Sequence, residues 1–112
     1  MHDMTSPQLS QARFQSALQS VFHIRPLSGE GAPIAAKLVD VKVMRAPEGC
    51  EQFAALFIGP MEPSYVRQGI YRFVHDALGE MDLFMVPVGP GKTGMQYEVC
   101  ITRDVLGHAA PR

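Results

Sequence analysis

From Phe22 onward, apolar and polar residues alternate with a period of two, and Gly and Pro residues interrupt this alternation. The pattern is typical of strands joined by turns, because successive side chains of a strand point to opposite faces of the sheet. We expect six strands, near residues 22–25, 34–44, 52–58, 69–75, 80–88 and 95–103. The sequence therefore predicts a mainly β fold, a compact antiparallel sheet folded as a six-stranded barrel or sandwich.

Turn residues indicate how the last three strands connect. Asp76 and Gly79 occupy the first and fourth positions of a type I turn. This turn predicts a hairpin between the two strands that flank it. The glycine-rich segment 89–94 is short enough to reverse the chain once more. We therefore expect an antiparallel meander. Pro87 lacks a backbone N–H and should face an edge, a bulge or a strand end.

An amphipathic helix is predicted over residues 7–21, before the first strand. Its apolar side chains recur at helical spacing and are Phe14, Ala17, Leu18 and Val21. We expect this stripe to dock onto the chain's own sheet or onto a partner, and the β domain to be complete without the first twenty residues. The expected division is an N-terminal helix at 1–21, a β domain at 22–103 and a flexible tail at 104–112.

Length and charge exclude several classes of protein. A chain of 112 residues is expected to form one domain. Its net charge of -1 provides no field that attracts phosphate backbones or anionic lipid, so neither nucleic acid nor membrane is an expected partner. The sequence shows no export signal and no long apolar run, which predicts a cytoplasmic protein with Cys50 and Cys100 as free thiols.

A set of linked motifs makes the pattern more specific. They read Phe53-x-x-Leu56-Phe57-x-Gly59-Pro60, Gln68-Gly69-x-Tyr71, His75-x-x-Leu78-Gly79 and Leu83-Phe84-x-Val86-Pro87-Val88-Gly89-Pro90. Over residues 20–102 the chain resembles a family of small bacterial proteins known only as a domain of unknown function. The resemblance implies a compact antiparallel β domain and carries no catalytic residues. It also implies an association with phage-derived, tail-collar-like fibre proteins, and thus a role in assembly.

No string of residues predicts catalysis, a cofactor or a metal ion. Gly91-Lys92-Thr93 ends like a phosphate-binding loop, but Val86 replaces its first glycine and a strand follows instead of a helix. Glu80 and Asp82 share one strand face, as acids on a solvated strand do. His75, beside Asp76, is interpreted as a turn-stabilising residue rather than a ligand.

Two functions from different classes remain. We prefer a non-catalytic protein-interaction or assembly module that binds a protein partner or a second copy of itself. Its expected contact residues are Phe14, Leu18, Val21, Tyr65 and Arg67. The alternative is a small β barrel that holds a small-molecule ligand in its mouth.

Overall fold

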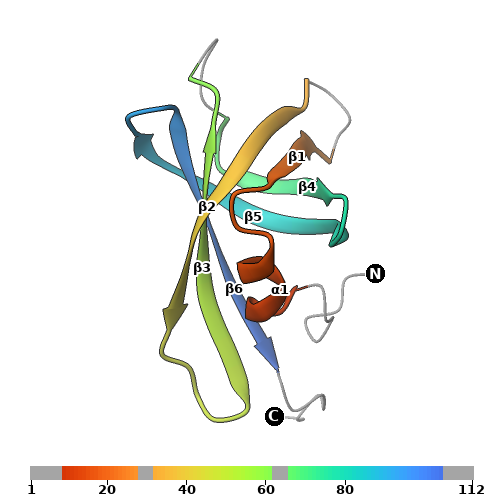
Figure 1. Ribbon diagram of the computed structural model, residues 1–112, viewed down its shortest axis with the longest axis vertical. Helices are drawn as coiled ribbons and strands as arrows, with labels where there is room; N and C mark the ends of the chain where they lie inside the picture. Colours follow the sequence, from red (N-terminus) through yellow and green to blue (C-terminus); the bar gives the residue numbers. More distant parts are fainter. Residues whose placement is uncertain (1–8, 28–31, 62–65, 105–112) are drawn as a thin grey trace.

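The computed structural model describes residues 9–27, 32–61 and 66–104, which form one short helix and six strands (Figure 1). The helix α1 spans Gln11–Ser16. The strands are β1 (Val21–Pro26), β2 (Ile34–Met44), β3 (Cys50–Gly59), β4 (Gly69–His75), β5 (Gly79–Pro90) and β6 (Met95–Asp104). All six predicted strands are present at the predicted places, which confirms the mainly β fold.

The six strands form one antiparallel sheet that closes into a barrel, with the order β1-β2-β3-β6-β5-β4 and β4 paired back to β1. The chain thus makes two three-stranded meanders, β1–β2–β3 and β4–β5–β6, joined along β3–β6 and β1–β4. The predicted hairpin of β4 with β5 and the predicted pairing of β5 with β6 are both confirmed. The fold is therefore a barrel and not a sandwich.

The ring is tight at one end and splayed at the other. In the register of the described residues, only the second half of β5, from Val86, pairs with β6. The first half of β5 continues with β4, while the end of β6 continues with β3, so the two strands diverge (Figure 1). The helix α1 lies at this splayed end, where it contacts β2 and β3.

Hydrogen bonds attach α1 to both sides of the splayed end. The side chain of Ser10 caps the helix by accepting from the backbone N–H of Arg13 at 3.1 Å. A carboxylate oxygen of Glu51 on β3 accepts from the backbone N–H of Gln11 at 2.9 Å and from Arg103 of β6 at 3.2 Å. The Arg13 guanidinium donates to the carbonyl of Ala77, in the β4–β5 turn, at 3.1 Å. The helix therefore bridges the two meanders where their strands separate.

Aromatic rings fill the barrel interior. The ring of Phe22 lies 5.1 Å from that of Phe57, and Phe57 lies 5.3 Å from Phe73. Phe14 of α1 extends this cluster, with its ring 5.4 Å from that of Phe53, and its side chain is fully buried. These ring contacts form the aromatic core of the barrel near α1.

The helix is shorter than the sequence pattern predicts, and it belongs to the core. It ends at Ser16, and Gln19 adopts a left-handed conformation (φ 71°) from which its N–H donates to Leu38 of β2 at 2.7 Å. Val21 is consequently the first residue of β1. Leu9 and Phe14 are buried in the barrel core, so the helical segment packs against the chain's own sheet, which is one of the two expected alternatives. That the β domain is complete without the first twenty residues stays a prediction.

Two turn features follow the prediction from sequence. Gly79, which closes the β4–β5 hairpin, has a φ of 83°, a conformation that glycine adopts without steric cost. The pairing of β5 with β6 shifts register between Pro87 and Gly89, so the proline lies at a bulge. The bulge removes the need for an N–H at this point of the ladder.

Candidate functional site

The residues predicted for protein contact do not come together in one surface. Phe14 is buried, whereas Leu18 and Val21 are 38% and 46% exposed near the start of β1. Arg67 is exposed but lies near the opposite end of β1, since Pro26 of β1 pairs with Tyr71 of β4. Tyr65 lies outside the described residues. The predicted set therefore contains one core residue and two separate exposed regions.

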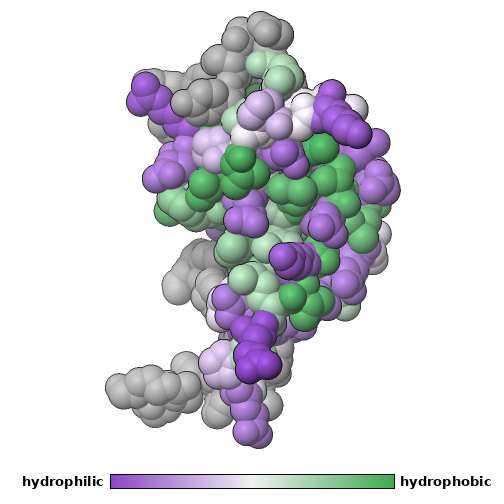
Figure 2. Space-filling model, turned by 90° about the vertical axis from the view of Figure 1, so that its left-hand side faces the viewer, coloured by the Kyte–Doolittle hydropathy of each residue, from purple (hydrophilic) through white to green (hydrophobic). Residues whose placement is uncertain are grey.

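A more continuous apolar feature lies on the outer face of β4 and β5. Ile70 of β4 and Phe84 of β5 are directly opposite each other in the ladder and are 55% and 50% exposed. Val88, further along β5, is also exposed. Figure 2, which looks at the left-hand side of the molecule as drawn in Figure 1, shows apolar and hydrophilic side chains interspersed over the surface. A large exposed aromatic side chain is costly in water and is typical of a contact surface.

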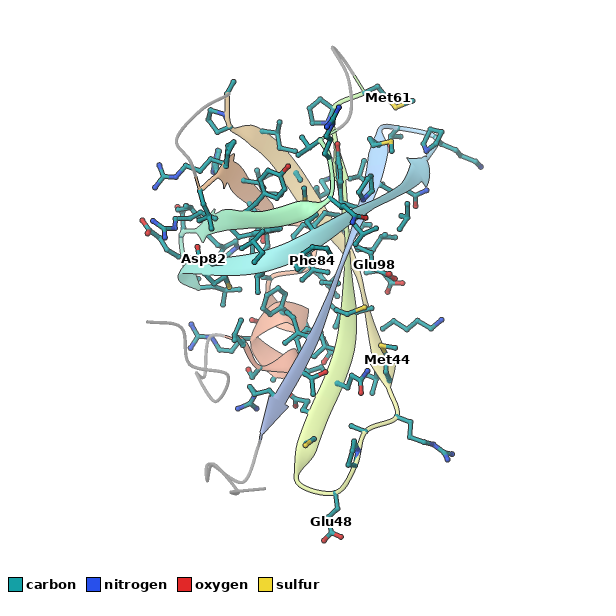
Figure 3. All side chains as sticks on the ribbon, turned by 180° about the vertical axis from the view of Figure 1, so that it is seen from behind. Met44, Glu48, Met61, Asp82, Phe84 and Glu98 are labelled. Carbon is teal, nitrogen blue, oxygen red and sulfur yellow. The ribbon has the colours of Figure 1, made fainter. Side chains whose placement is uncertain are left out.

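Charged side chains flank this apolar pair. The Arg72 guanidinium donates to both carboxylate oxygens of Asp82, at 2.9 and 3.2 Å, and lies 3.9 Å from Glu80. On the other side, Glu98 of β6 is opposite Val86. Figure 3 shows Phe84 between Asp82 and Glu98. The pairing of Glu80 and Asp82 with Arg72 fits the interpretation of these acids as a charged strand face.

The structure brings His75 next to Ser20, a contact that the sequence did not reveal. The Nε2 atom of His75 lies 2.8 Å from the Ser20 hydroxyl, which itself donates to the carbonyl of Ala17. The Nδ1 atom accepts from the backbone N–H groups of Ala77 and Leu78, at 3.0 and 3.2 Å. His75 therefore holds the β4–β5 turn, as predicted, and also joins it to the segment between α1 and β1.

This arrangement differs from a catalytic Ser–His pair. A backbone N–H can only donate, so Nδ1 must be the unprotonated nitrogen and Nε2 must carry the proton. The imidazole then donates to Ser20, whereas a general base has to accept from the serine hydroxyl. The hydrogen bonds thus describe a structural link in which His75 is neutral.

Acid should weaken this link. Burial lowers the pKa of His75, and the nearby Asp76 opposes this effect without cancelling it. The unfolded chain, with a histidine pKa of about 6.5, therefore binds the proton more readily than the folded chain does. We expect the free energy of unfolding to fall as the pH is lowered through about 6.5.

Urea unfolding from about pH 8 to about pH 5.5 measures this effect. His75→Asn is the matched control, because its amide oxygen can still accept from the turn N–H groups but does not titrate. The variant should lose less stability than the natural protein over this range. An identical loss in both proteins would mean that His75 is not the responsible group.

A small apolar pocket lies between β1, β2 and β4, at the end of the barrel away from α1. Its volume is about 200 Å³, and its lining residues are Ile24, Pro26, Ala32, Ile34, Val66 and Tyr71. The wall around it is held by two tyrosines. The Tyr97 hydroxyl accepts from the backbone N–H of Val66 at 2.9 Å, and the Tyr71 hydroxyl donates to the carbonyl of Arg67 at 2.7 Å.

Other chemical groups are placed apart from one another. Lys92 and Thr93 are exposed in the turn that leads directly into β6, without the helix that a phosphate loop requires. Cys50 and Cys100 are free, and burial together with Glu98 raises the pKa of the Cys100 thiol, which weakens it as a nucleophile. Among residues 9–27, 32–61 and 66–104, no three His, Cys, Asp or Glu side chains form a group that could hold a metal ion.

The geometry defines a six-stranded antiparallel barrel closed at one end by a short helix, with an apolar pocket at the other. The chain belongs to the family described as Domain of unknown function (DUF6916), whose model matches residues 9–101. This match begins at Leu9 and so includes α1, which the resemblance noted from sequence did not. No curated protein and no solved structure was found to match this chain. None of the described helical segments has the length and apolar content needed to cross a membrane.

Proposed function

We propose that this domain is a protein-interaction module whose contact surface is the outer face of β4 and β5, centred on Ile70 and Phe84. The observation that carries the proposal is the pairing of these two large apolar side chains, each about half exposed, directly across the β4–β5 ladder. Aromatic side chains in such positions supply a large share of binding energy when a partner removes them from water.

The charges around the pair indicate the chemistry of the partner. Three carboxylates, those of Glu80, Asp82 and Glu98, lie on the same outer face as Phe84, together with two guanidiniums, those of Arg72 and of Arg25, which is opposite Arg72 on β1. A partner surface with an apolar group flanked by Lys or Arg complements this distribution. We therefore propose that the partner is a different protein whose surface has this character. Association with phage-derived fibre or collar proteins, and a cytoplasmic location, stay predictions.

The test is capture of the partner from the natural host, followed by binding measurements with the two purified proteins. Phe84→Ser and Ile70→Ser should each weaken binding at least tenfold, which corresponds to about 1.4 kcal/mol. Binding should also weaken as salt is raised, because screening reduces the attraction between opposite charges. If the captured protein binds both variants as tightly as the natural chain, the proposal is not supported.

Val43→Ser is the matched control, since Val43 is 58% exposed but lies on β2, outside the proposed surface. It should bind like the natural protein. If Val43→Ser weakens binding as much as Phe84→Ser, the contact surface has been placed wrongly. If light scattering shows that the chain self-associates and no second protein is captured, the proposed partner is excluded.

A further inference from the structure

The pocket between β1, β2 and β4 is lined mainly by apolar side chains. Of its six residues, Tyr71 alone has a polar side chain, and the hydroxyl of Tyr71 already donates to the carbonyl of Arg67. No charged side chain is among the described residues that line it. Water gains few hydrogen bonds in such a space, so the pocket favours an apolar occupant.

The core forms the inner limit of the pocket. Ile34, Val66 and Tyr71 pack against the buried cluster of the barrel, and Tyr97 beneath them is fully buried. Ala32 is exposed, so it lies where the pocket meets solvent. The hydrogen bond from Val66 to Tyr97 and that from Tyr71 to Arg67 hold the wall in place without a ligand. A wall held in this way reduces the ordering cost of binding.

We propose that this pocket binds one small, uncharged, apolar molecule of about the size of toluene. Its volume of about 200 Å³ suits such a ligand, because a dry protein cavity of about 150 Å³ already accepts benzene. The site is distinct from the surface proposed for protein contact. Tyr71 is opposite the buried Leu83 and so faces the interior, whereas the neighbouring Ile70 faces outward.

The proposal is tested by titrating the full chain with toluene while following methyl signals by NMR. The methyl groups of Ile24, Ile34 and Val66 should shift saturably, with a Kd of roughly millimolar order. The methyl group of Ile101, on the splayed part of β6, should not shift. Glycerol, a polar molecule of similar size, should cause no saturable shift.

Ala32→Leu and Val66→Phe both place additional carbon in the pocket and should weaken toluene binding at least tenfold. Ala35→Leu is the matched control, because Ala35 is exposed on β2 and does not line this pocket. It should bind toluene like the natural protein. The proposal is overturned if shifts grow linearly without saturation, if glycerol binds in place of toluene, or if a folded filling variant binds toluene unchanged.

Discussion

Replacing Phe14 by alanine should destabilise the whole domain by about 3–5 kcal/mol, the usual cost of deleting a buried phenylalanine ring. Phe14 is fully buried and its ring lies against those of Phe22 and Phe53, which belong to two different strands of the barrel. Alanine has a higher helix propensity than phenylalanine, so the loss cannot come from a weaker helix. The free energy of unfolding in urea measures the effect.

Gln15→Ala is the control for this experiment, since Gln15 lies on the exposed side of the same helix. It should change stability by no more than about 0.5 kcal/mol. If Phe14→Ala cost only as much as this control, the β domain would be stable without the packing of α1, as the sequence pattern predicts. A large cost would establish that the domain includes its helix, in agreement with the family match from residue 9.

The strands could be predicted because local patterns decide them. Alternating residues in β2 place Ala36 and Leu38 in the core and Lys37 in solvent, as period-two burial requires. The type I turn residues before Gly79 likewise define the β4–β5 hairpin without reference to the rest of the chain. Closure of the ring could not be predicted, because the β1–β4 pairing joins segments that share no short turn.

The extent of the helix was predicted wrongly for a physical reason. Val21 continues the helical spacing of Phe14, Ala17 and Leu18, yet the same residue also fits the alternation of β1. Tertiary hydrogen bonds decide between the two. The N–H of Gln19 and the carbonyl of Ser20 both pair with Leu38 of β2, so the chain leaves the helix before Val21.

The candidate sites were accessible to sequence analysis only in part. The alternation of β5 already places Phe84 on the same face as Glu80 and Asp82, and the proposed contact surface could have been derived from it. The contact of His75 with Ser20 and the apolar pocket depend on which strands become neighbours. Such neighbours are set by long-range packing, which leaves no local signal in the sequence.

A close approach of two backbone segments makes Gly94 the most constrained residue of the turn between β5 and β6. A Cβ atom at this position would lie 2.2 Å from the carbonyl oxygen of Gly59 and 2.8 Å from the Cγ2 atom of Ile58. The first contact involves backbone, which cannot move aside by changing a rotamer. The turn is also closed by a hydrogen bond of 2.7 Å from the N–H of Gly91 to the carbonyl of Gly94.

Gly94→Ala should therefore destabilise the domain by about 3 kcal/mol or more, at or above the usual range for overpacking, because the end of β3 and the turn must separate. Gly91→Ala in the same turn is the matched control. The three atoms nearest to its Cβ would all belong to the flexible side chain of Gln96, the closest at 3.2 Å, so its cost should stay below about 1 kcal/mol. Urea unfolding of both variants compares the two costs. A cost below about 1 kcal/mol for both variants would show that the approach of Gly94 to Gly59 is not tight in solution, and that the turn tolerates a side chain at either glycine.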